Sequence, residues 1–497
     1  MFPILTVMVA LPAVGAAVLF ALPEGARKRG REIALGFAAV ELVLAAVLFF
    51  AFDQAKAGEF QFSETYAWIP QIGTSWALGV NGIGLSLVLL SAILVPLAIL
   101  SAWRDDKDPK RRANYLALVL ASQAFMIGIF AARDIFLFYV LFEAMLIPMY
   151  FLIGSFGGVQ RRYAAVKFLI FSLVGGLVML VGVIALYVAG PGGEQGFLTD
   201  KLTGLHLSTA TERLLFLAFF LAFAIKAPMF PVHTWLPTVA ESARPSTTAL
   251  LVAVLDKVGT FGMLTLCLVL FPNASRWAAP VIIILAVISV LYGAILAIGQ
   301  DNMLRLVSFT SVSHFGIMVI GIFAFSQTSV TGAAFYMFNH GLSTGALFFA
   351  VAYLIKRHGS ASVKDYGGLQ KVAPVMAGTF LIIGLSALSL PGLSPFISEI
   401  LVFIGAFPVV PVAVIFATVG VVLAALYILL TYKKVFTGPT PKSMKSTRDL
   451  SLRERLVTWP LIALMLVLGF LPGIMLDVLR EPVKDIVSIV SAEEAGK

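Results

Sequence analysis

The sequence predicts an all-α polytopic membrane protein with about fourteen transmembrane helices. The prediction rests on composition: of 497 residues, 60% are hydrophobic and only 12% are charged. An ordinary soluble domain has about 25% charged residues, and a soluble chain of this length would need enough of them to cover several domains. The composition therefore excludes soluble globular, disordered and fibrous proteins.

Apolar segments account for nearly the whole chain. A spanning helix needs about 20 mainly apolar residues. The expected spans are 3–22, 32–52, 79–103, 113–132, 134–154, 164–190, 212–236, 246–271, 278–299, 303–325, 328–355, 373–405, 408–432 and 457–479. The first lacks a basic leader and a clear cleavage site, so we expect a retained span and not a signal peptide. The longest polar segments are 53–78, 191–211, 433–456 and the tail after 480.

Basic residues alternate between the loops. Loops after odd-numbered spans hold 24 lysines and arginines, whereas loops after even-numbered spans and the tail hold 8. By the positive-inside rule the odd-numbered loops are cytoplasmic and both termini face the other side. The net charge of +9 is thus explained by topology and requires no nucleic-acid partner.

Cysteine usage limits the chemistry of this chain. A single cysteine, Cys267, excludes a disulfide framework, cysteine-rich zinc sites and iron–sulfur clusters carried by the chain itself. It lies in the apolar run LTLCLVL, so we expect a small buried hydrophobe. No group of histidine and acidic residues has metal-ligand spacing, and no convincing dinucleotide motif occurs. We therefore expect no metal or cofactor to be bound by this chain.

Charged residues inside spans are the first functional candidates, because a charge at the bilayer centre costs at least a few kcal/mol. Glu143 lies in FYVLFEAMLIPMY, too far from a span end to reach the interface. Lys226 precedes Pro228 and Pro231, which free carbonyls that protein or water must satisfy. Such groups favour proton or ion handling; the alternatives are a structural ion pair or, for Lys226, an incidental lysine beside a proline kink.

Further polar groups lie deeper along the chain. Lys257 is expected to face a polar axis without necessarily touching Asp256, because neighbouring residues point about 100° apart on a helix. His314 and His340 occupy consecutive spans amid hydroxyl side chains, and imidazole exchanges protons near neutral pH. We favour a proton relay for both, with a hydrogen-bonded core histidine as the alternative. Lys167, close to two arginines, is expected to reach the cytoplasmic interface.

Two expected spans are interrupted by proline pairs. Pro391 and Pro395 break span twelve before Glu399, as the earlier pair breaks span seven. Corresponding broken spans indicate repeats around a polar midplane. The separations agree: Glu143 to Lys226 is 83 residues and His314 to Glu399 is 85. We expect two inverted five-helix repeats, each with one broken helix.

This pattern divides the chain into four parts. They are the N-terminal helices one to three at 1–112, the first repeat at 113–271, the second repeat at 272–436, and helix fourteen with the tail at 437–497.

Five motifs together resemble the antiporter-like membrane subunits of respiratory complex I, the proton-translocating NADH–quinone oxidoreductase. They are FYVLFEAMLIPMY, KAPMFPVHTWLP, ARPSTTALLVAVLDKVGTFG, RLVSFTSVSHFGIM and FNHGLSTGALFF. Within that family the chain is most similar to the M type, which carries a glutamate in broken span twelve where the L and N types carry a lysine; Glu399 matches it. The chain also ends without the long lateral helix of the L type. The segment PGLSPFISE departs from the sequence that is usual in the family around this glutamate.

The resemblance implies a role for each candidate. Glu143 would be the charge partner that modulates Lys226, the proton-holding lysine of the first half. Lys257 would connect along a central axis to His314 and His340. The resemblance further makes Glu399 the terminal protonatable site of the second half.

The resemblance also implies partners. NADH, FMN, iron–sulfur clusters and quinone would belong to partner subunits, with L-type and N-type antiporter-like subunits as neighbours in the membrane. A bacterial cytoplasmic membrane is expected because the chain carries no transit peptide. Three alternatives stay open: a subunit of a multisubunit sodium–proton antiporter or membrane-bound hydrogenase, a single-chain solute permease, and a passive scaffold.

Overall fold

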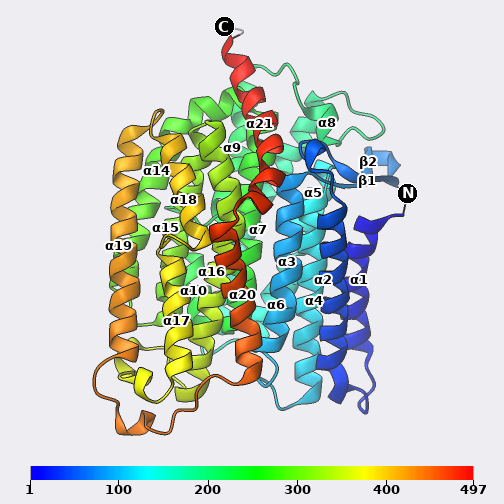
Figure 1. Ribbon diagram of the computed structural model, residues 1–497. Helices are drawn as coiled ribbons and strands as arrows, with labels where there is room; N and C mark the ends of the chain where they lie inside the picture. The colour runs from blue at the N-terminus through cyan, green and yellow to red at the C-terminus, as the bar shows by residue number, and fades with distance from the viewer. Residues whose placement is uncertain (1, 496–497) are drawn as a thin grey trace.

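The computed structural model describes residues 2–495, most of which lie in long helices standing side by side (Figure 1). The first helices are α1 (Ile4–Ala21), α2 (Gly30–Ala51), α3 (Gly82–Ser101), α4 (Pro109–Ala131), α5 (Ile135–Ala144), α6 (Leu146–Phe156), α7 (Arg161–Ala189), α8 (Thr199–Leu202), α9 (Thr209–Lys226) and α10 (Trp235–Ser242). A composite helix follows, made of α11 (Pro245–Leu250), η4 (Leu251–Leu255), α12 (Lys257–Gly262), η5 (Met263–Cys267) and α13 (Leu268–Leu270). The remaining helices are α14 (Pro272–Ile298), α15 (Met303–Phe323), α16 (Gln327–His358), α17 (Pro374–Ala387), α18 (Ser394–Ala406), α19 (Pro411–Phe436), α20 (Leu452–Phe470) and α21 (Gly473–Ala495).

The predicted membrane-protein class is confirmed, but the count of fourteen spans is not. Within the described part of the chain, eleven helices are long and apolar enough to cross a bilayer, and the bent pair α20–α21 would make a twelfth. The helix α9 has 18 residues but carries three charged side chains, and α17 and α18 are each too short to span alone. The difference between the expected and the observed number of spans therefore comes from the expected spans that prolines divide into shorter helices.

Both predicted breaks are present. The helix α9 ends at Lys226, and regular helix resumes only at Trp235, beyond Pro228 and Pro231. The helix α17 ends at Ala387, and α18 begins at Ser394 with a proline in its first turn. Proline lacks the N–H that the helix ladder requires, so each pair stops the helix and leaves irregular backbone inside the bundle.

A β-hairpin replaces much of the loop expected at 53–78. Its antiparallel strands are β1 (Gln61–Ile69) and β2 (Thr74–Val80), and it lies beside the first helices (Figure 1). The Glu64 carboxylate accepts a hydrogen bond from the backbone N–H of Leu5 at 2.8 Å and thus satisfies a free donor at the start of α1. The hairpin was missed because its strands do not alternate between buried and exposed residues: β1 is mostly exposed and β2 is mostly buried.

The C-terminal end also differs from expectation. The single span predicted at 457–479 is two helices, α20 and α21, bent by 68°. The helix α20 stops at Phe470, just before Pro472, and α21 continues through the segment expected to be a polar tail. Proline at this point prevents one straight helix.

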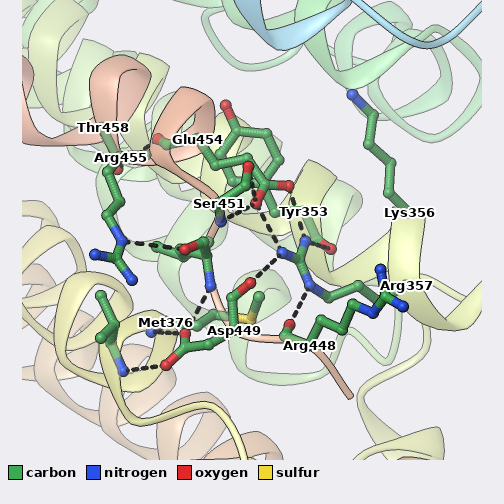
Figure 2. A network of polar contacts seen from close by, with 12 residues as sticks. Tyr353, Lys356, Arg357, Met376, Arg448, Asp449, Ser451, Glu454, Arg455 and Thr458 are labelled. Atoms are coloured by element: carbon green, nitrogen blue, oxygen red, sulfur yellow. Dashed lines mark hydrogen bonds and ion pairs between the residues drawn. The ribbon is translucent and has the colours of Figure 1, made fainter. Parts of the chain in front are cut away.

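A polar network fixes the α19–α20 connection against the end of α16 (Figure 2). The Arg357 guanidinium donates to both carboxylate oxygens of Glu454 at 2.9 and 2.7 Å and to the carbonyls of Arg448 and Asp449. The Asp449 carboxylate accepts backbone N–H groups at the start of α17, including that of Met376 at 2.8 Å. The network therefore anchors three elements around α16, which carries part of the candidate site.

Candidate functional site

The six predicted site residues come from six different helical elements of the bundle. The set is Glu143 on α5, Lys226 on α9, Lys257 on α12, His314 on α15, His340 on α16 and Glu399 on α18. All are buried except Glu143, which is partly buried. Polar groups this deep need partners or function.

Glu143 lies in the last turn of α5, directly before the irregularity at Met145 that separates α5 from α6. Its carboxylate packs against Gly176 of α7, where any added Cβ would overlap Oε1. Among the described residues that oxygen has no hydrogen-bond partner. The absence of a side chain at Gly176 thus leaves room for the Glu143 carboxylate.

Lys226 is the last residue of α9 and is fully buried beside the broken stretch. Its Nζ donates to Ser172 Oγ at 3.2 Å and lies 5.1 and 5.0 Å from the ring centroids of Phe142 and Phe168. The rings provide cation–π stabilisation for the ammonium.

Glu143 and Lys226 lie close enough to interact electrostatically, although the described side chains form no ion pair between them. Ser172, which binds the lysine, and Gly176, which faces the carboxylate, are one turn apart on α7. The structure therefore places the predicted pair side by side without direct contact.

Lys257 stands between two π-helical segments. Its Nζ donates to the Val252 carbonyl at 2.8 Å, lies 2.7 Å from His340 Nδ1, and sits 4.6 Å from the ring centroid of Phe315. The wider π-helical turn changes the usual backbone pairing, and such turns are frequent at functional sites. Asp256 is also fully buried; within residues 2–495 its carboxylate has no hydrogen-bond partner.

The two histidines lie ring to ring, with centroids 5.4 Å apart. His340 accepts from Lys257 at Nδ1 if the amine is charged, and its Nε2 lies 3.1 Å from the Thr344 hydroxyl. His314 Nδ1 lies 2.6 Å from the hydroxyl of Tyr336. The predicted link from Lys257 to the histidines is thus present as a direct contact to His340 and a ring contact onward.

Glu399 completes the sequence of contacts. Its Oε2 accepts hydrogen bonds from Tyr336 at 2.9 Å and from Ser389 at 2.5 Å. Tyr336 therefore joins His314 to Glu399, a connection that sequence reasoning missed. The available signal was its position one turn before His340 on a helix.

Other candidates lie outside this chain of contacts. Lys167 donates to Thr238 of α10 at 3.0 Å. His233 is buried in the α9–α10 break, with its ring 5.2 Å from that of Tyr292. Cys267 is buried, as expected.

Comparison with known proteins shows the family of this chain. Residues 132–425, which include all six predicted site residues and Tyr336, match the family described as NADH:quinone oxidoreductase/Mrp antiporter. This chain belongs to that family. A relative in the family, NADH-quinone oxidoreductase subunit M of Mycobacterium tuberculosis, is 42% identical over 99% of this chain and 95% of its own length.

Solved structures show the family fold over the whole length. A chain of respiratory complex I from Thermus thermophilus matches with a TM-score of 0.90 and 30% identity, covering 98% of this chain and 99% of that one. A chain of the Mrp complex from Dietzia matches with a TM-score of 0.87 at 21% identity, covering 99% and 98%. The second likeness shows the fold alone, and the likeness to subunit M rests on the sequence relatives.

Proposed function

We propose that this chain translocates protons across the membrane as the M-type subunit of an NADH–quinone oxidoreductase. The observation that supports it most is the series of buried contacts from Lys257 through His340 and His314 to Glu399. Groups that can each hold a proton follow one another across four helices, α12, α16, α15 and α18, inside a family whose relatives are named for this enzyme.

In the first half, Glu143 and Lys226 act as an adjustable pair. Opposite charges about 4 Å apart interact by about 4 kcal/mol at an effective dielectric of about 20. Bringing the carboxylate to that distance stabilises the ammonium, and separating them favours release of its proton. The irregularity at Met145, next to Glu143, gives α5 a point at which its end can move. The separated arrangement described above is then the proton-releasing one.

In the second half, protons pass from Lys257 to Glu399. Asp256 interacts electrostatically with both Lys257 and Lys226, which couples the charge states of the two halves. The two inverted repeats, 113–271 and 272–436, would supply one half each, flanked by 1–112 and 437–497.

The energy for this transfer comes from partners. NADH, FMN, iron–sulfur clusters and quinone belong to other subunits, since one cysteine cannot provide a cluster ligand set. L-type and N-type antiporter-like subunits are its membrane neighbours. The complex lies in a bacterial cytoplasmic membrane, with both termini of this chain on the non-cytoplasmic side.

A second candidate function is a subunit of a multisubunit sodium–proton antiporter, because the family includes Mrp antiporters and the fold matches one. Purification of the native complex separates the two. Copurified flavin and iron–sulfur subunits support the oxidoreductase, whereas small membrane subunits alone support the antiporter.

The decisive experiment compares proton translocation and NADH–quinone turnover in vesicles carrying Lys226→Ala or Glu143→Ala. We expect assembled complexes whose translocation falls by about 100-fold or more in each variant. Lys167→Ala is the matched control, since that lysine donates to Thr238, lies over the ring of Tyr163 and touches none of the six site residues, and it should leave translocation unchanged. Normal translocation in both Lys226→Ala and Glu143→Ala would make the chain a passive scaffold.

A further inference from the structure

Tyr336 lies between His314 and Glu399, two of the predicted residues of the second half. No hydrogen bond joins His314 to Glu399 directly in the described structure, yet the Tyr336 hydroxyl contacts His314 Nδ1 at 2.6 Å and Glu399 Oε2 at 2.9 Å. The side chain is 1% exposed, so bulk water cannot replace it. A buried phenol between an imidazole and a carboxyl group is placed to carry a proton between them.

We propose that Tyr336 is a proton-relay residue that connects His314 to Glu399, an inference that rests on the proposed function. A phenol has one proton and an oxygen that can also accept, so it donates to one neighbour while it accepts from the other. With Glu399 ionised, Tyr336 donates to the carboxylate and accepts from His314 Nδ1–H.

The transfer step balances without any added reactant. The step starts from a protonated His314 imidazolium: its Nδ1–H bond breaks as an O–H bond forms on Tyr336, and the original tyrosine O–H breaks as one forms on Glu399 Oε2. The tyrosine regains one proton and now donates to the neutral histidine. One proton has moved from the imidazole to the carboxyl group, and the phenol has reversed its direction.

The surroundings fix this geometry. Ser389, in the α17–α18 break, donates to the same Oε2 at 2.5 Å and holds the carboxylate toward the phenol. The Tyr336 ring lies 5.8 Å from the ring of His314 and 6.3 Å from that of His340. The hydroxyl is therefore held by packing as well as by hydrogen bonds.

Removal of one oxygen tests the relay. In the assembled complex, Tyr336→Phe keeps the ring packing but breaks both hydrogen bonds, and we expect proton transfer through this segment to slow by about 100-fold or more. Tyr427→Phe is the matched control: that tyrosine is equally buried and interacts electrostatically with Glu399, but in the described structure its hydroxyl has no hydrogen-bond partner. Translocation should be unchanged in this control, and Glu399→Gln serves as the reference for a blocked outlet.

The outcomes separate this inference from the proposed function. Normal translocation in Tyr336→Phe, with loss in Glu399→Gln, would overturn the relay and leave the proposed function standing. Normal translocation in Glu399→Gln would overturn the proposed role of the second half and the relay with it. Equal losses in the two tyrosine variants would overturn the relay, because a hydroxyl without hydrogen-bond partners would then matter as much as the bridging one.

A spectroscopic measurement on the unmodified complex removes any dependence on variant folding. Infrared difference spectra with isotope-labelled tyrosine should show a C–O stretching band that responds to protonation of Glu399, because the phenol exchanges its donor and acceptor roles. The response should vanish in Glu399→Gln and persist in Tyr427→Phe. A tyrosine band that does not respond in the wild-type complex would refute the relay.

Discussion

Gly176 shows how a single residue can set the position of a functional carboxylate. Any side chain at this position would overlap Glu143 Oε1. In the Gly176→Ala variant the Glu143 carboxylate must therefore leave its place beside α7. We expect translocation to fall as it does in Glu143→Ala, with little change in stability, because the group that must move is the end of a flexible side chain. Proton translocation and thermal unfolding of the purified complex measure the two effects.

A helical glycine with free space around it is the control for this substitution. Gly378, on α17, has no heavy atom within 4 Å of an added Cβ, so Gly378→Ala should keep full translocation and match or exceed wild-type stability. Full translocation in Gly176→Ala would show that the position of Glu143 is not important for function.

At the residue scale, the charged members of the candidate site could be predicted from the sequence, whereas the uncharged Tyr336 could not. Glu143, Lys226, Lys257 and Glu399 were found because a charged group inside an apolar run has no ordinary explanation. Tyr336 was missed because a tyrosine among aromatic and small residues reads as core packing. Its role depends on which groups face its hydroxyl, and this is set by packing between α15, α16 and α18.

At the element scale, one ion pair holds the start of the Lys257-bearing composite helix. Arg244, directly before α11, donates to both oxygens of Asp106 at 2.7 and 2.9 Å, and Arg111 adds a contact at 3.1 Å. Burial raises the pKa of Asp106, but these guanidinium groups outweigh it and hold the pKa below its usual range. The contact ties the α3–α4 loop to the element that positions Lys257.

We expect Asp106→Asn to destabilise the protein by about 2 kcal/mol at neutral pH, because a half-buried bidentate charge pair loses its carboxylate. An aspartate with a lowered folded-state pKa stabilises the fold at neutral pH, and this contribution is lost as the pH falls through the folded-state value. The wild-type and Asp106→Asn unfolding midpoints should therefore converge below about pH 4. Thermal unfolding in detergent at several pH values measures this.

The exposed pair of Asp301 and Lys364 is the comparison for that experiment. Its side chains are 54% and 74% exposed, so solvent screens the attraction and Asp301→Asn should change the midpoint little at any pH. Equal effects of the two substitutions would argue against a special role for the Asp106 contact.

The elements themselves were partly predictable. Proline pairs located the breaks after Lys226 and Ala387, since the loss of a helix N–H is a local property. The irregularity at Met145 lies three residues before Pro148, so a proline marks it as well, whereas the π-helical turns around Lys257 carry no such mark in the sequence. They depend on neighbouring helices, and the hairpin at 61–80 likewise depends on contacts with α1.

At the scale of the whole molecule, the charge alternation predicts which ends of the bundle face the cytoplasm. The connection after α19 and the loop after α7 lie at opposite ends of the bundle (Figure 1). With the adjoining helix ends, the first carries seven basic residues, whereas the second carries two, Lys201 and Arg213. The positive-inside rule therefore places them on opposite sides of the membrane.

Cysteine labelling tests this assignment, because the chain has one native cysteine, and it is buried. In a Cys267→Ala background, Ser446→Cys places a thiol on the first loop and Glu194→Cys on the second; both positions are exposed. A membrane-impermeant maleimide should label position 446 only in inverted vesicles and position 194 only in right-side-out vesicles. The chain with Cys267 alone should stay unlabelled in both. Labelling of both new cysteines from the same side would contradict the alternating topology, and reversed sidedness would place both termini in the cytoplasm.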